Sequence, residues 1–156
     1  MKIKIIAVGK RMPNWVTTAY EEYAKRLSHH FQISLHEINT PTRTKNADIN
    51  KLMSKEADEI LALIESNDYV IALDEYGKQW TTMELAKQLD TWQQAHSTIV
   101  FLIGGPDGLA TECKQRAQAQ WSLSQLTLPH PLVRIVLIEQ LYRAHSILQG
   151  HPYHRE

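Results

Sequence analysis

The chain has 156 residues, which fits one domain that buries a core without help from metals or disulfides. Its single cysteine, Cys113, cannot form an internal disulfide. The sequence also has no charged-then-apolar leader and no apolar run of about 18 residues. These features argue against a secreted or membrane-spanning protein and predict a cytoplasmic one.

The charges balance overall but are unevenly distributed. The chain has 17 basic and 17 acidic residues, and ten of the basic residues but only four of the acidic ones fall within residues 1–55. A uniformly basic nucleic-acid binder is therefore excluded, although the N-terminal third could supply phosphate contacts. A solvated surface of uneven charge would explain the same distribution.

The first elements read as a strand followed by a helix. Residues 2–8 begin with strand-like alternation and become continuously apolar, as in a strand of a covered sheet. Asn14 can cap a helix. This helix is expected to carry four residues at helical spacing: Trp15, Tyr20, Tyr23 and Leu27.

A second strand, a polar loop and a second helix follow. Residues 31–38 read as the strand, and residues 39–46 read as a loop that includes Pro41, Arg43 and Lys45. The next helix is expected to gather one apolar face: Ile49, Leu52, Met53, Ile60, Leu61 and Ile64. The loop before it is the best candidate for a basic contact surface.

The pattern then repeats. Residues 69–73 read as a short buried strand, and residues 74–78 have turn chemistry. Thr81 and Glu84 have the spacing of a capping box at the start of a helix. The buried stripe of that helix is expected to be Leu85, Leu89 and Trp92.

The last third contains a strand at 98–103, a short helix around 111–119, a strand at 121–124 and a final helix at 132–149. Alternating strands and helices predict an α/β fold: one domain, residues 1–156, with a mostly parallel sheet and helices on both faces. The four tryptophans, at 15, 80, 92 and 121, are expected in the core or at a dimer interface.

Three expected strand ends converge on one place where such sheets bind ligands: Leu73, Gly104 and the loop that starts at Leu123. The glycines of Gly104-Gly105-Pro106-Asp107-Gly108 let a ligand approach the backbone, which can recognise an adenine edge. The two loops hold no Lys or Arg before Arg134, which favours a cofactor of low negative charge over a phosphate-rich nucleotide. A tight turn leaving a buried strand is the alternative for the glycine run.

His130 lies between Pro129 and Pro131, near the expected start of the final helix. The positive end of a helix favours the neutral imidazole, which suits a proton acceptor or a hydrogen-bond donor to substrate. A histidine that merely caps or packs is the alternative.

The chain ends in a polar segment, His151-Pro152-Tyr153-His154-Arg155-Glu156. It carries reactive groups, although terminal residues are often only disordered. Zinc held by His151 and His154 with His130 or His145 is not expected, because the spacing on a proline-broken tail suits it poorly.

Several motifs together resemble one known family. They are residues 102–109 (LIGGPDGL), 126–134 (LTLPHPLVR), 141–144 (LYRA) and the terminal HPYHRE, with further likeness at 8–10, 45–49, 73–74 and 77–78. The chain is similar in these segments to the RlmH family, the ribosomal large-subunit RNA pseudouridine N3-methyltransferases of the SPOUT superfamily. The resemblance covers nearly the whole chain.

The resemblance implies a C-terminal trefoil knot, which periodicity could not have predicted. It also implies S-adenosylmethionine as the cofactor, bound in bent form among the knotted loops, and no metal. By position, the cofactor contacts carry over to Leu73, Gly104, Leu123, Ser124, Gln125, Leu126, Thr127 and Leu128.

The implied reaction is methylation of a pseudouridine in 23S ribosomal RNA, in the large subunit or the whole ribosome, by a homodimer. Such a reaction needs alignment, exclusion of water and loss of the N3 proton. The candidate catalytic residues are His130, Tyr153, His154 and Arg155, and Arg143 is a candidate clamp for a phosphate or carbonyl. Two alternatives remain: a related methyltransferase of transfer RNA or another ribosomal site, and a non-catalytic ribosome-binding module.

Overall fold

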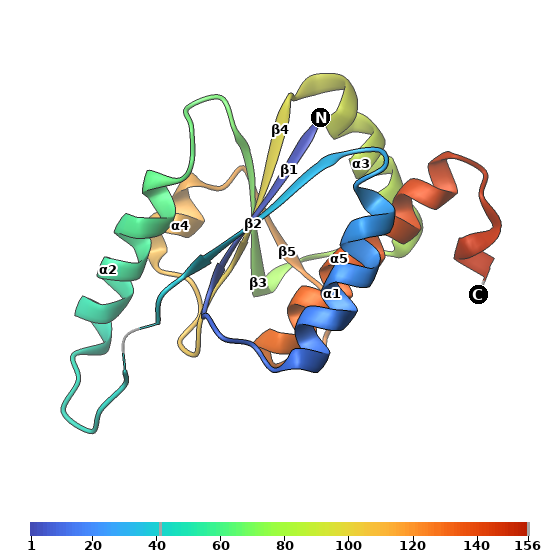
Figure 1. Ribbon diagram of the computed structural model, residues 1–156. Helices are drawn as coiled ribbons and strands as arrows, with labels where there is room; N and C mark the ends of the chain where they lie inside the picture. The colour runs from blue at the N-terminus through green and yellow to red at the C-terminus, as the bar shows by residue number, and fades with distance from the viewer. Residues whose placement is uncertain (41, 156) are drawn as a thin grey trace.

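A five-stranded sheet organises the computed structural model, which describes residues 1–40 and 42–155 (Figure 1). Pro41 of the predicted basic loop and Glu156 of the tail lie outside the described residues. The strand order is β2-β1-β4-β3-β5, and every neighbouring pair is parallel. In chain order the elements are β1 (Lys2–Val8), α1 (Asn14–Leu27), β2 (Gln32–Ile38), α2 (Ile49–Ala62), β3 (Tyr69–Gln79), α3 (Thr82–Ala95), β4 (Thr98–Ile103), α4 (Thr111–Arg116), β5 (Ala119–Ser122), α5 (His130–Leu148) and the short 3₁₀ helix η1 (Pro152–Arg155).

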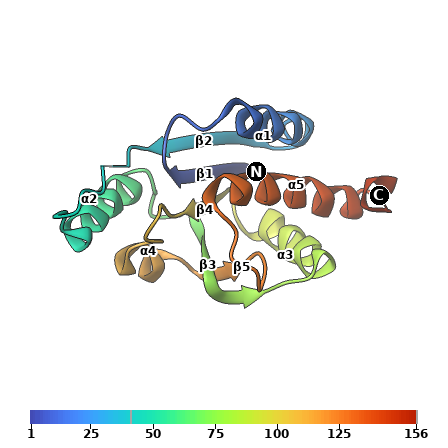
Figure 2. The ribbon, with the colours of Figure 1, turned by 90° about the horizontal axis from the view of Figure 1, so that it is seen from below.

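Helices cover both faces of the sheet (Figure 2). Helices α1, α3 and α5 bury one apolar cluster, which includes Leu27, Leu89 and Leu141. Helices α2 and α4 bury a second cluster, which includes Ile60 and Cys113. Strands β1 and β4 contribute to both clusters, because their side chains alternate between the two faces. The predicted α/β architecture is confirmed.

The third helix begins as predicted, whereas the first does not. Thr81 accepts a hydrogen bond from the Glu84 backbone N–H, and the Glu84 carboxylate accepts one from the Thr81 N–H. For α1 the prediction that Asn14 is the cap was wrong, because Pro13 occupies that position without a side-chain cap and Asn14 is the first helical residue. The restricted backbone of Pro13 suits the extended conformation before a helix.

The predicted turn at residues 74–78 was wrong, because β3 continues through it. The strand pairs with β5 up to Leu73 and again from Lys78, with a shift of register between them. The shift leaves residues 74–77 bulged away from the regular ladder. Within this bulge a Cβ on Gly77 would lie 2.7 Å from the Trp121 backbone nitrogen, so the close approach requires glycine.

Other differences are small. The structure ends α4 at Arg116, places β5 two residues earlier than predicted and starts α5 at His130; Ile64 lies beyond the end of α2. Trp92 and Trp121 are buried and Trp80 packs between them, whereas Trp15 is 55% exposed and is not part of the core. Within residues 1–40 and 42–155, no helix has both the length and the apolar composition needed to span a membrane.

Candidate active site

A cleft of about 460 Å³ opens where β3, β4 and β5 reach the same edge of the sheet. Its walls are the β3 bulge, the loop after β4 and the loop between β5 and α5. Most of the predicted cofactor contacts line it: Leu73, Gly104, Leu123, Ser124, Leu126, Thr127 and Leu128. Gln125 does not line the cleft, and its side-chain amide points instead toward Gln79, at 3.5 Å.

The glycine loop is a tight backbone structure in which Gly104, Gly105 and Gly108 bring the chain close to itself. Gly105 and Gly108 form an antiparallel bridge, and Gly108 adopts a left-handed φ of 78°. A Cβ on Gly104 would lie 2.5 Å from the Gly108 carbonyl carbon, which leaves no room for a side chain. Gly104 therefore presents only backbone groups to the cleft.

The opposite wall is shaped by Ser124. Its hydroxyl accepts a hydrogen bond from the Leu126 backbone N–H at 2.9 Å, and its carbonyl accepts one from the Ser122 hydroxyl at 2.9 Å. This local turn places Leu126 at the mouth of the cleft, where it remains 75% exposed.

The side chains around the cleft do not favour an anion. The acidic lining residues are Asp74, Glu75 and Asp107, and the basic one is Lys114. Lys114 lies 3.4 Å from the Asp74 carboxylate, so its charge is already compensated. This lining agrees with the predicted preference for a cofactor of low negative charge.

His130 lines the cleft and joins its glycine loop to α5. Its Nδ1–H donates to the Gly104 carbonyl oxygen at 2.8 Å, and its Nε2 accepts from Arg134 Nε at 2.8 Å. Burial lowers the pKa of His130, and the Arg134 charge also lowers it, against the opposing effect of the Gly104 bond. His130 is therefore a neutral linker with both ring nitrogens engaged within the chain.

Arg134 ties this linker to the first two strands. The residue is 2% exposed, and its guanidinium pairs with Glu37 at 2.6 Å and donates to the Gly9 carbonyl oxygen at 2.7 Å. The sequence reasoning gave Arg134 no role. The one available signal was its position four residues after His130, which places both side chains on one helical face.

Arg43 also differs from the expectation of a solvent-facing basic loop. Its guanidinium pairs with Glu56 of α2 at 2.5 Å and with Asp107 of the glycine loop at 3.0 Å. Glu56 is 4% exposed, so this carboxylate depends on the cation beside it. Sequence reasoning missed Glu56, although an acidic residue beside an apolar helix face was a signal.

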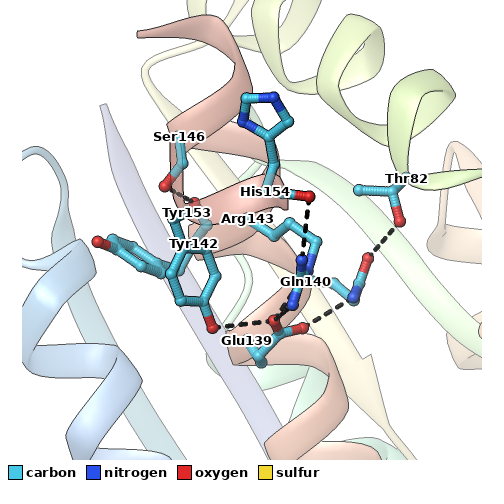
Figure 3. A network of polar contacts seen from close by, with 8 residues as sticks. All are labelled: Thr82, Glu139, Gln140, Tyr142, Arg143, Ser146, Tyr153 and His154. Carbon is cyan, nitrogen blue, oxygen red and sulfur yellow. Dashed lines mark hydrogen bonds and ion pairs between the residues drawn. The ribbon is translucent and has the colours of Figure 1, made fainter. Parts of the chain in front are cut away.

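The tail folds back onto the C-terminal half of α5 (Figure 3). Tyr153 is buried, its ring meets Tyr142 edge-on with 4.6 Å between centroids, and its hydroxyl donates to Glu139 at 3.0 Å. Arg143 pairs with Glu139 at 2.6 Å and lies 5.0 Å from the Tyr153 ring centroid. Tyr153 thus anchors the tail to α5.

Glu139 is the centre of this network (Figure 3). Its second oxygen accepts from the Gln140 amide at 2.7 Å, and Gln140 in turn accepts from the Thr82 hydroxyl of α3 at 2.8 Å. The network therefore connects the tail, α5 and the start of α3. Sequence reasoning identified the tail and Arg143 but not Glu139.

The predicted catalytic residues fall into two groups. His130 begins α5 and borders the cleft, whereas Tyr153, His154 and Arg155 lie beside the far half of the same helix. The nine residues from His130 to Glu139 correspond to roughly 13 Å along the helix. The structure of one chain therefore does not bring the tail to its own cleft.

The tail residues also differ from one another. His154 Nδ1 lies 2.7 Å from the His151 carbonyl oxygen and can donate to it, whereas Arg155 is exposed. Among the described residues, no three His, Cys, Asp or Glu side chains are grouped so that they could hold a metal ion.

Comparisons with known proteins agree with these features. A family model described as "Predicted SPOUT methyltransferase" matches residues 1–154. Proteins named ribosomal RNA large subunit methyltransferase H are similar over their full lengths: that of Hahella chejuensis is 53% identical over 100% of both chains. Those of a Marinomonas species and Methylococcus capsulatus are 50% and 47% identical, each over 99% of this chain and 100% of the relative. The resemblance seen in the motifs is confirmed, and the chain belongs to the SPOUT methyltransferase family, whose reaction requires a methyl donor.

Proposed function

We propose that this chain transfers a methyl group from S-adenosylmethionine to N3 of a pseudouridine in 23S ribosomal RNA, as a cytoplasmic homodimer acting on the large subunit or the whole ribosome. The observation that carries the proposal is the cleft between the glycine loop and the Leu123–Leu128 loop. The names of the full-length relatives support ribosomal RNA as the substrate class.

The residues around the cleft fit S-adenosylmethionine. The volume of about 460 Å³ is that of a small-ligand site. Leu73, Leu123 and Leu128 offer apolar contact for a planar base, and the Gly104 backbone offers hydrogen bonds to its edge. Glu75, the lining carboxylate that forms no ion pair among the described residues, favours the positive charges of the sulfonium and amino groups. The knot implied by the resemblance remains part of this proposal.

When bound, S-adenosylmethionine would supply its methyl group to N3: the carbon–nitrogen bond would form as the carbon–sulfur bond breaks, leaving S-adenosylhomocysteine, and the N3 proton would pass to a base or to water. The chain must hold the two partners in line and keep water out. His130 serves this purpose as a positioning residue, because its bonds to Gly104 and Arg134 fix the glycine loop against α5.

The tail residues have distinct parts in the proposal. Burial, the hydrogen bond with Tyr23 and the charge of Glu139 raise the pKa of Tyr153, so Tyr153 stays protonated and anchors the tail. If His154 donates through Nδ1 to His151, its Nε2 is left as an acceptor, which suits a base for the N3 proton. Arg155 then offers a cation for a base oxygen or a phosphate.

The separation of these groups supports the homodimer of this proposal. The tail lies along the far half of α5, so a second copy would have to bring its tail to this cleft for His154 and Arg155 to act there. The exposed Trp15 is a candidate contact between copies.

The test is transfer of labelled methyl from S-adenosylmethionine to ribosomes that lack the modification, prepared with and without pseudouridine. We expect label in a large-subunit pseudouridine with the intact chain, and none with a chain truncated after Gly150 that still binds the cofactor. Label in transfer RNA or another ribosomal nucleotide would favour the related methyltransferase. Cofactor binding without transfer to any RNA would overturn the assigned reaction.

A further inference from the structure

A second concavity borders the cofactor cleft. It encloses about 720 Å³ at the carboxyl ends of β1 and β2. Gly105, Pro106 and His130 line both spaces and form the wall between them. A molecule held in this groove would therefore lie beside whatever occupies the cleft.

The two spaces have opposite charge. Among the described residues, the groove is lined by two cations, Lys10 and Arg11, and by no carboxylate. Both cations are exposed, and neither forms an ion pair in the described chain. The cleft across the wall is lined by three carboxylates: Asp74 pairs with Lys114 and Asp107 pairs with Arg43, whereas Glu75 forms no ion pair among the described residues.

The basic residues that have carboxylate partners are therefore different from those that face the groove. Arg43 and Arg134 lie nearby, but Glu56, Asp107 and Glu37 compensate their charges. Lys10 and Arg11 keep their charge directed to solvent on a short connection between β1 and α1. Two exposed cations of this kind attract the phosphate groups of a nucleic-acid backbone.

We propose that this groove, between the β1–α1 connection and the Gly105–Pro106 wall, binds the phosphate backbone of the RNA strand next to the target nucleotide through Lys10 and Arg11. The target base would then reach across the wall toward the cofactor cleft. The charges of the two spaces thus match their ligands: the cleft attracts the positively charged methyl donor, and the groove attracts the polyanion. This inference rests on the proposed function, and it names the surface that holds the RNA.

The experiment compares two double variants. The groove variant combines Lys10→Gln and Arg11→Asn, and the control variant combines Lys51→Gln and Lys55→Gln. Asn is chosen because Arg11 has a φ of 59°, which Asn tolerates better than most residues. The control pair removes the same charge from exposed positions of α2. Methyl transfer to unmodified ribosomes is measured over a range of salt concentrations, and cofactor binding is measured by titration.

We expect the groove variant to raise KM for ribosomes about tenfold, with kcat and cofactor affinity within about twofold, and to reduce the salt slope by about one or two. The control pair should behave as the unaltered chain. The inference would be overturned, and the proposed function left intact, by either of two results: a KM and salt slope of the groove variant equal to those of the unaltered chain, or an effect of the control pair as large as that of the groove variant. If the unaltered chain transfers no label to ribosomes, the proposed function fails and the inference fails with it. If the double variant folds poorly, the single variant Lys10→Glu, which leaves Arg11 in place, must also raise KM for ribosomes.

Discussion

Arg134 Nε donates a hydrogen bond to His130 Nε2 across one turn of α5, at 2.8 Å. A ring nitrogen can accept only when it carries no proton, so Arg134 selects the tautomer with the proton on Nδ1. That proton is donated to Gly104, on the wall of the cleft. The protonation state of one histidine is thus linked to the shape of the glycine loop.

Cofactor affinity should fall in acid because of this link. The pKa of His130 is lowered from its ordinary value of about 6.5, so folding favours the neutral ring. The contribution of His130 is complete above pH about 6.5 and is lost as the pH falls through its folded pKa. Titration of S-adenosylmethionine from pH 7.5 downward should show binding that starts to weaken only below pH about 6.5, because the lowered pKa keeps the folded ring neutral above that pH. His130→Gln, which has a donor and an acceptor but does not titrate, should show a smaller difference, and an equal loss in both proteins would contradict the link.

Arg134→Met should destabilise the chain by about 1–3 kcal/mol, because it leaves the buried Gly9 carbonyl and the half-buried His130 Nε2 without their donor. Glu37, His130 and the Gly9 carbonyl each lose a bond. Arg134→Lys keeps the charge but cannot reach three acceptors with a planar fork, so it should recover only part of the loss. Urea unfolding at pH 7.5 measures both variants, and full recovery by lysine would show that charge alone matters.

The Arg43–Glu56 pair should show strong coupling. Arg43→Met leaves Glu56 buried without its cation and should cost about 3 kcal/mol of unfolding free energy. Adding Glu56→Gln removes the uncompensated charge, so the double variant should be more stable than Arg43→Met alone. A double-mutant cycle by urea unfolding measures the coupling. Additive losses would mean that the pair contributes nothing beyond its separate residues.

Glu139→Gln should release the tail without opening the cofactor cleft. The change removes the charge that pairs with Arg143 and weakens the acceptor for the Tyr153 hydroxyl. Under the proposed function, kcat for ribosome methylation should fall about tenfold or more, since each lost charged hydrogen bond is worth roughly 1.5–3 kcal/mol. Cofactor affinity should stay within about twofold. Limited proteolysis of the C-terminal segment reports the release, and an unchanged kcat with a released tail would exclude the tail from catalysis.

His145→Leu should stabilise the chain in acid. His145 is 4% exposed, its two ring nitrogens have no hydrogen-bond partner among the described residues, and it packs against His30 and Phe31. Burial and then the His30 charge lower its pKa, so protonation below pH about 6.5 opposes folding. The urea midpoint of the leucine variant should change less between pH 7.5 and 5.5 than that of the unaltered chain. An equal change would assign the acid sensitivity to other groups.

Hydrophobic pattern and capping residues predicted most of the fold because those signals are local. The apolar run at β4, the Thr81 capping box and the start of β1 each depend on residues that are neighbours in sequence. The β3 bulge was missed because its cause is not local: residues 74–77 resemble a turn, but β5 pairs with the strand on both sides of them. Turn chemistry alone cannot distinguish a bulge from a strand end.

The cleft was also predictable, because parallel strands bring their carboxyl ends to one edge of the sheet. The ion pairs around it were not. Glu37 and Arg134 are 97 positions apart, and Arg43 and Asp107 are 64 apart, so no spacing rule connects them. The basic loop was therefore predicted to face solvent, although Arg43 is bound by two carboxylates.

The crowding at Gly104 bears on inhibition. The position has no space for any side chain, so this part of the loop offers a ligand only peptide groups that single substitutions can hardly alter. A compound that bonds to those groups would be difficult to evade by mutation, because replacing Gly104 would disrupt the loop together with the drug site. Compounds that depend on the exposed Leu126 would lack this protection. Resistance should therefore arise first at the side-chain wall of the cleft and last at its backbone wall.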